Sequence, residues 1–167
     1  PLKYQVVIQL AIDSGCRRGE LTGLCWEDVD FTKSTISINK TTQRTNIGII
    51  EKDHPKNSSS IRTITIAPQT IKLLLEYKKE QEQLKKKLGS AWQNSNKILT
   101  NKYGGNMHPD TPSKIFKKIQ LKYNLKSLNF HGLRHTSASM LIDSNIHTKI
   151  ISKRLGHSSS AITDTIY

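Results

Sequence analysis

The sequence predicts a mainly α-helical domain that carries one small three-stranded antiparallel β-sheet. Apolar residues recur at helical spacing near the start of the chain and again through its second half. Between residues 34 and 66, isoleucines instead alternate with polar residues, as they do in strands that bury one face. A chain of 167 residues is long enough to bury a core without disulfides or metal, so we treat residues 1–167 as one domain.

Two helices are predicted before the sheet. The first covers Tyr4 to Asp13, a stretch rich in valine, leucine and isoleucine, and it ends near Ser14-Gly15. A short helix from Arg18 to Leu24 follows it. The junction between them reads SGCRRGE, which places two arginines at the start of the second helix.

The predicted sheet draws on three groups of isoleucines. The groups are Ile36 and Ile38, then Ile47, Ile49 and Ile50, then Ile61, Ile64 and Ile66. We expect them to form the three antiparallel strands. The second connection, from Lys52 to Ser60, is rich in Asn, Ser and Pro, so it should be an exposed, mobile turn.

The second half of the chain is predicted to be largely helical. Its elements are a long helix opening at Pro68 and ending in lysines 85–87, a short strand at 97–100, a turn at Gly104-Gly105, a helix over 111–123, a helix over 130–143, and a helix over 148–155 closed by Gly156. A short segment leads from there to Tyr167.

The charge balance points to a polyanionic partner. Lysine and arginine number 26 against 13 acidic residues, which gives a net charge of +13. Nucleic acid is the leading candidate. A membrane surface would attract the same charge, but no apolar run approaches the roughly 20 residues of a spanning helix, and no signal segment opens the chain. We therefore expect a cytoplasmic protein.

Metal binding is not expected. Cys16 and Cys25 lie nine residues apart, which matches no zinc signature and is a poor disulfide spacing. His131 and His135 lie four apart, but the glutamate of a metalloprotease helix is missing.

Four lysines of the 111–123 helix share one of its sides. They are Lys114, Lys117, Lys118 and Lys122. Two interpretations stay open: a solvated face, or a contact with the backbone of DNA.

Phosphate binding is the chemistry that the remaining motifs favour. His131 and Arg134 are three apart on a predicted helix, so both can reach one anion. Arginine donates two parallel hydrogen bonds to phosphate oxygens, and Arg17 could grip the same phosphate from the opposite side. Two such clamps would stabilise a pentacoordinate transition state without metal.

A nucleophile and an acid complete this hypothesis. Tyr167 could attack the phosphodiester, conserving the bond energy as a phosphotyrosine and freeing a 5′ hydroxyl. Lys56, in the turn HPKNSSSIRTI, is placed to protonate the leaving 5′ oxygen. Ordinary alternatives are a surface ion pair for a lone arginine, solvation for a loop lysine, and a structural role for His135.

These residues resemble the tyrosine recombinases, or phage-type integrases. SGCRRGELTGLCWEDVDF is similar to the first arginine box of the family, HGLRHTSASML to its His-x-x-Arg box, and LGHSSSAITDTIY to its closing segment. The resemblance runs from about Leu2 to Tyr167. It implies the catalytic-domain fold of DNA breaking-rejoining enzymes.

The resemblance also implies residue roles. Arg17 and Arg134 would clamp the phosphate, with Glu20 orienting the site and Arg18 left on the surface. Lys56 would be the general acid, although Lys52 in the same connection remains an alternative.

The remaining roles fall to the two histidines of the motifs and the tyrosine. His131 would bind phosphate or carry the proton of the phenol, and His157 would donate a further hydrogen bond. Tyr167 would be the nucleophile.

The implied activity is site-specific recombination, with metal-free cleavage through a 3′-phosphotyrosine and religation, for integration or excision of a phage or conjugative transposon. Implied partners are double-stranded DNA, three further copies of the full-length protein, and an accessory excisionase or DNA-bending protein. No cofactor is implied. The rivals are relaxation of DNA by a type IB topoisomerase and a non-catalytic DNA-binding module of the same fold.

Both ends of the sequence suggest a fragment. We expect an N-terminal clamp domain and a C-terminal tail in the parent protein, and a monomer for the fragment alone. Without that tail, Tyr167 is expected to be displaced from Arg17 and Arg134 in the absence of DNA.

Overall fold

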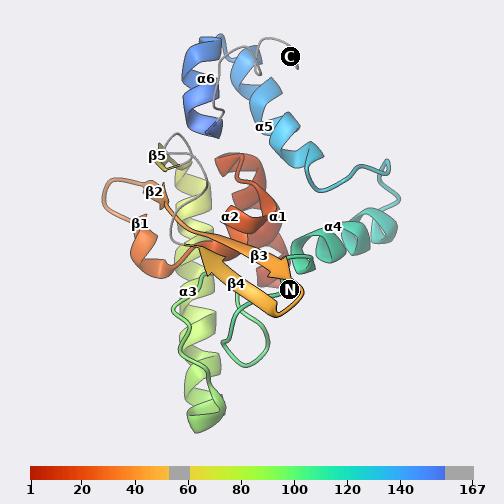
Figure 1. Ribbon diagram of the computed structural model, residues 1–167. Helices are drawn as coiled ribbons and strands as arrows, with labels where there is room; N and C mark the ends of the chain where they lie inside the picture. Colours follow the sequence, from red (N-terminus) through yellow and green to blue (C-terminus); the bar gives the residue numbers. More distant parts are fainter. Residues whose placement is uncertain (53–60, 157–167) are drawn as a thin grey trace.

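The computed structural model describes residues 1–52 and 61–156 (Figure 1). Its helices are α1 (Leu2–Ser14), α2 (Arg18–Gly23), α3 (Pro68–Leu88), α4 (Thr111–Lys122), α5 (Gly132–Asp143) and α6 (Thr148–Leu155), with short 3₁₀ turns at Trp26–Asp28 and Gly89–Ala91. Its strands are β1 (Val29–Asp30), β2 (Thr35–Ile38), β3 (Thr41–Thr45), β4 (Gly48–Lys52) and β5 (Arg62–Thr65). The fold is mostly helical with small antiparallel sheets, which confirms the predicted class.

Helix α1 lies at the centre and packs against α3, α4 and α5. Val6, Val7, Leu10 and Ala11 are buried because their spacing places them on one face of the helix. The helix ends at Gly15, which has φ of 60° and donates its N–H to the Ala11 carbonyl.

Helix α3 begins with Pro68 at its first turn, as predicted. Ile71, Leu74, Tyr77 and Gln81 form its buried stripe. The stripe stops there, and the last turns extend away from the body and expose lysines 85–87 (Figure 1).

The three-stranded sheet has the order β1-β2-β5, and all its pairs are antiparallel. Ile36 pairs with Ile64 across β2 and β5, and both side chains are buried in the main core. Two of the predicted isoleucine groups therefore do form strands of this sheet. The third strand is β1, which is only two residues long.

The third predicted strand lies elsewhere. Residues 48–52 form β4, which pairs with β3 in a separate two-stranded hairpin. Ile47 is 91% exposed at its turn, so these isoleucines do not mark a core-facing strand. The partner strand β3 reads TTQRT, and its lack of apolar residues explains why alternation did not reveal it.

The hairpin packs directly on α2. The hydroxyls of Thr22 and Thr42 hydrogen-bond to each other at this contact. A Cβ on Gly19 would lie 2.6 Å from the Thr42 carbonyl oxygen, so the hairpin backbone approaches α2 as closely as glycine allows.

The predicted strand at 97–100 is reduced to two isolated bridges, Cys25 with Lys97 and Thr100 with Asn106. The later helices agree with prediction to within two residues, including the end of α6 at Gly156. Ala138, Ile151 and Leu155 form a second, smaller core between α5 and α6. Among the described residues, no helix combines the length and apolarity needed to cross a bilayer.

Candidate active site

Arg17 stands at the N-cap of α2 and is held by Glu20. Its backbone N–H and its Nη1 donate to the two carboxylate oxygens of Glu20, each at 2.9 Å. An acidic residue three positions after the cap accepts the cap N–H in many helices. The Arg17 side chain is still 43% exposed, so its guanidinium is oriented by Glu20 but remains accessible.

Glu20 is itself buried, and a second arginine accounts for this. Arg62 of β5 donates Nη2 to Oε2 at 2.9 Å and Nη1 to Oε1 at 3.3 Å. Burial raises the pKa of Glu20, but the hydrogen bonds and charges of Arg62 and Arg17 outweigh it and hold the pKa below its ordinary value. The carboxylate is therefore ionised at neutral pH.

Arg62 was not among the predicted site residues. A signal for it was present, because it lies two and four positions before Ile64 and Ile66 and so shares their inward face. An arginine on such a face needs a buried partner.

Arg134 projects from α5 and is only 3% exposed. Its Nη1 donates to the Gly15 carbonyl and its Nη2 to the Leu155 carbonyl, both at 2.7 Å. Burial and repulsion from Arg17 lower the pKa of Arg134 to about 10, which leaves it protonated at neutral pH.

Three arginines converge on the end of α6. The Arg154 carbonyl accepts a hydrogen bond from Arg62 at 2.6 Å, and the Leu155 carbonyl accepts one from Arg134 at 2.7 Å. The Gly156 carbonyl accepts one from Arg17 at 3.2 Å. The last carbonyls of a helix have no partner within the helix and carry partial negative charge. The end of α6 thus draws together cations from three separate elements, and it immediately precedes His157.

His131 lies at the start of α5 and is exposed. With Arg18, Ser113 and Asn129 it lines an open cleft of about 340 Å³. The pKa of His131 is lowered mainly by desolvation, and further by the positive charges of His135, Arg134 and Arg17. The neutral imidazole is therefore favoured.

His135 packs edge-on against His131, with ring centroids 5.0 Å apart. It is half-buried. Arg18 forms an exposed ion pair with Asp110 at 2.8 Å, which is the surface role expected of it.

The structure therefore brings Arg17, Glu20, His131 and Arg134 to one region. Lys56, His157 and Tyr167 lie outside the described residues. Lys52, the alternative lysine, is half-buried at the end of β4.

The four lysines of α4 are all exposed, whereas Ile115 and Phe116 of the same helix are buried. Three of them line two neighbouring grooves: Lys118 borders both, with Lys114 in one and Lys122 in the other.

Both cysteines are free and buried. Burial, together with the charge of Glu20, raises the pKa of Cys16 to about 11, so its thiol stays protonated at neutral pH. Across residues 1–52 and 61–156, no three His, Cys, Asp or Glu side chains gather as metal ligands would.

Comparison with known proteins matches the chain to one family. Residues 1–167 match the phage integrase family. The chain is 32% identical over 177 residues to a XerC-like tyrosine recombinase of Caldanaerobacter subterraneus, covering 99% of this chain and 45% of that relative. It is 34% identical over 161 residues to the integrase of Staphylococcus phage L54a, covering 92% of this chain and 44% of that relative. The chain thus spans less than half the length of either relative.

A solved structure of low identity has the same fold. The Tn1549 transposon integrase, in complex with a circular intermediate DNA, superposes with a TM-score of 0.83 at 22% identity. The match covers 99% of this chain and 54% of that one.

Proposed function

Since the chain belongs to the phage integrase family of tyrosine recombinases, we propose that residues 1–167 form the catalytic domain of a site-specific DNA recombinase. One observation carries the proposal. Arg17 and Arg134, which come from opposite ends of the chain, donate to the neighbouring carbonyls of Gly156 and Leu155. When a nucleophile attacks a phosphodiester, negative charge builds on the phosphate oxygens, and two fixed cations at one point stabilise that charge.

In the proposed reaction, the two guanidiniums bind the non-bridging oxygens of the scissile phosphate. The buried pairs around Glu20 orient Arg17 before DNA binds, so little reorganisation is needed when charge builds on those oxygens. Glu20 is thus a positioning residue, and the negative charge it contributes is offset by Arg62.

Tyr167 is proposed as the nucleophile. Its phenolic oxygen forms a bond to phosphorus, and the bond from phosphorus to the 5′ oxygen breaks, which leaves a 3′-phosphotyrosine. The neutral imidazole favoured at His131 suits it to accept the phenol proton, and His157 is assigned a hydrogen bond to the phosphate.

Lys56 is proposed to supply the proton that the departing 5′ oxygen needs, which yields a 5′ hydroxyl. In the second half of the reaction, a 5′ hydroxyl attacks the phosphotyrosine and Tyr167 is released. The bond energy is kept throughout, so no cofactor is needed.

Double-stranded DNA is the proposed substrate, with its backbone held in part by the four lysines of α4. The net charge of +13 and the exposure of these lysines support this. We assign the full-length protein to a phage or transposon and to a tetramer on its attachment site, with an excisionase or DNA-bending protein as accessory factor. We assign the activity to the cytoplasm, where that DNA lies.

The test is a nicked suicide duplex that carries the attachment site. We expect a covalent protein–DNA adduct that forms in EDTA and is absent in Tyr167→Phe. An adduct that persists in Tyr167→Phe, or that needs a divalent metal, would contradict the mechanism. Relaxation of supercoiled plasmid that lacks the site would indicate the topoisomerase alternative, and binding without any adduct the non-catalytic module.

A further inference from the structure

Arg62 is a buried arginine that takes no step in the proposed reaction. A buried guanidinium is costly unless it is paired and hydrogen-bonded, and Arg62 donates to two separate elements. Its Nη1 and Nη2 donate to Glu20 of α2, and its Nε donates to the Arg154 carbonyl at the end of α6. Arg62 therefore joins the two elements that Arg17 also contacts.

The guanidinium of Arg17 has one acceptor on each of these elements. Its Nη1 donates to Oε1 of Glu20 at 2.9 Å, and its Nη2 donates to the Gly156 carbonyl at 3.2 Å. Because the guanidinium is planar, acceptors at two of its nitrogens fix its orientation. Its further N–H groups are available for phosphate.

Both acceptors of Arg17 are held by Arg62. Oε1 of Glu20 accepts from Nη1 of both arginines, and Oε2 accepts from Arg62 Nη2 and from the Arg17 backbone N–H. Gly156 lies against the Arg62 guanidinium, since a Cβ on Gly156 would be 2.8 Å from Arg62 Nη1. The Arg154 carbonyl, two residues earlier, accepts from Arg62 Nε at 2.6 Å. The contacts thus form a closed ring through Arg62, Glu20, Arg17 and the end of α6.

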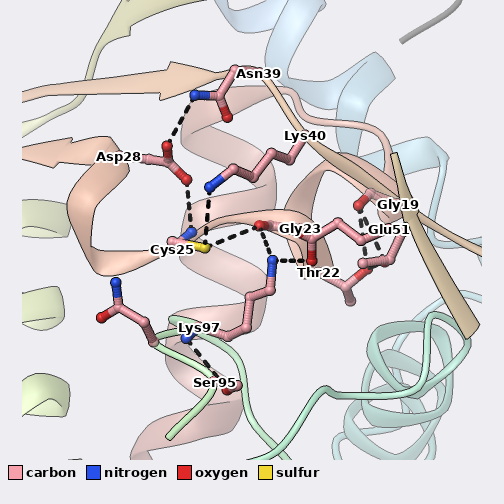
Figure 2. A network of polar contacts seen from close by, with 12 residues as sticks. Gly19, Thr22, Gly23, Cys25, Asp28, Asn39, Lys40, Glu51, Ser95 and Lys97 are labelled. Atoms are coloured by element: carbon pink, nitrogen blue, oxygen red, sulfur yellow. Dashed lines mark hydrogen bonds and ion pairs between the residues drawn. The ribbon is translucent and has the colours of Figure 1, made fainter. Parts of the chain in front are cut away.

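The opposite end of α2 is held by a different buried cation. Lys97 is 3% exposed, and its Nζ donates to the Gly23 carbonyl at 2.8 Å and forms an ion pair with Glu51 (Figure 2). Within residues 1–52 and 61–156, Lys97 forms no hydrogen bond or ion pair with Glu20 or Arg17. Lys97 therefore offers a matched control, because it is a buried, paired cation on the same helix but outside the ring.

We propose that Arg62 is a positioning residue for Arg17. Arg62 holds Glu20 and the end of α6 at the spacing at which the Arg17 guanidinium binds both. It thereby sets the direction in which the remaining N–H groups of Arg17 meet the scissile phosphate, without contacting the phosphate itself. This inference rests on the proposed function, in which Arg17 binds a non-bridging oxygen.

Arg62→Lys separates positioning from charge. Lysine keeps a positive charge beside Glu20, but its single ammonium cannot reproduce a planar fork that reaches Glu20 and Arg154 at once. Arg62→Lys should bind the attachment site as tightly as wild type. It should cleave the site roughly 10- to 100-fold more slowly, because a small displacement of a group that acts on the transition state is costly.

The experiment compares two kinds of nicked suicide duplex in single-turnover cleavage, at a temperature at which circular dichroism shows every variant to be folded. One kind has an ordinary scissile phosphate. In the other, a methyl group replaces one non-bridging oxygen, which removes the negative charge that a guanidinium would bind there. The two methylphosphonate isomers are tested separately.

Arg17→Lys identifies the informative isomer, on which its rate comes nearest to that of wild type. Arg62→Lys should be slow on the ordinary duplex and should nearly match wild type on that same isomer. Lys97→Met should match wild type on both duplexes, because it removes a buried cation at α2 without touching the ring.

Glu20→Gln interrupts the ring at a second point, so the result does not depend on the folding of one variant. Its amide nitrogen cannot accept a hydrogen bond, so contacts that Glu20 makes with both arginines are lost. Glu20→Gln should be relieved by the same isomer. The double variant Arg62→Lys, Glu20→Gln should be no slower than the slower single variant, because both changes act on Arg17.

Wild-type speed of Arg62→Lys on the ordinary duplex would overturn the positioning role and leave the proposed function standing. The same holds for a loss that the methyl group relieves in Arg17→Lys but not in Arg62→Lys, and for an equally large loss in Lys97→Met. If neither isomer relieved Arg17→Lys, the phosphate contact of Arg17 would be wrong, and this inference with it. A wild-type chain that forms no adduct on the ordinary duplex would overturn the proposed function as a whole.

Discussion

The carboxylate of Glu20 accepts hydrogen bonds from both terminal nitrogens of Arg62, at 2.9 and 3.3 Å. Both side chains are almost fully buried. Arg62 also donates its Nε to the Arg154 carbonyl at 2.6 Å. One side chain therefore links β5, α2 and the end of α6. Because removal of either partner leaves a buried charge uncompensated, this pair has consequences for stability as well as for the site.

Arg62→Met should destabilise the fold by about 3–5 kcal/mol, because Glu20 would remain buried without its main partner. Urea unfolding measures the change. Arg18→Met is the matched control: its ion pair with Asp110 is exposed, so its loss should cost less than about 1 kcal/mol. The double variant Arg62→Met, Glu20→Gln should recover part of the loss. If Arg62→Met and Arg18→Met were equally stable, the buried pair would contribute nothing beyond what the exposed pair contributes.

Glu20 should also make stability depend on pH. Its pKa is lower in the folded chain than the ordinary value of 4.5, so its contribution is fully present above that value and is lost as pH falls through the folded pKa. Unfolding free energies measured between pH 6 and pH 3 should therefore fall more steeply for wild type than for Glu20→Gln. Parallel curves would mean that the pKa of Glu20 does not change on folding.

Gly15→Ala should destabilise the junction between α1 and α6. The residue has φ of +60°, and a Cβ there would lie 2.5 Å from Leu155 Cδ2. Gly15 also has ψ of 20°, in the left-handed helical region, where alanine alone costs about 1–2 kcal/mol. The crowding against Leu155 should cost about 1–3 kcal/mol more. Thermal unfolding tests this, and a total loss of only about 1–2 kcal/mol would remove the packing term.

Arg17→Lys and Arg134→Lys should each slow adduct formation by roughly 10²- to 10³-fold, because lysine keeps the charge but cannot donate the parallel pair of hydrogen bonds. Binding to the attachment site should change little. Single-turnover cleavage and a binding isotherm separate the two effects. Arg18→Lys should cleave normally, and a defect there as deep as that of Arg17→Lys would reassign the clamp.

The α4 lysines should determine part of the salt dependence of DNA binding. Each lysine that neutralises a phosphate contributes about 0.9 to the slope of log K against log salt. Replacing Lys114, Lys117, Lys118 and Lys122 singly by alanine should lower the slope by that amount at each contacting position. Alanine at lysines 85–87, on the exposed end of α3, should leave it unchanged. An unchanged slope in all four α4 variants would mean that this face is solvated.

Local signals were sufficient for the helices and for part of the site. Pro68, Gly15 and Gly156 mark helix boundaries through their own backbone preferences, so the boundaries could be predicted without knowing what packs nearby. The pairing of Arg17 with Glu20 is also local, since the two lie within one turn of helix.

Pairing between distant segments was beyond the sequence. The pattern of isoleucines predicted strands at 36–38 and 61–66 but assigned 47–50 to the same sheet, because alternation indicates a strand without naming its partner. Strand β3 was missed because its threonines carry no apolar alternation.

By itself, then, the sequence determined the helices, the family motifs and the charge, all of which depend on residues close together in the chain or on composition. Only the tertiary structure decided that Arg62 neutralises Glu20, that three arginines meet at the end of α6, and that Lys97 holds Glu51. Each of these contacts joins residues far apart in sequence, and the attraction between its partners is stronger where fewer water molecules screen it.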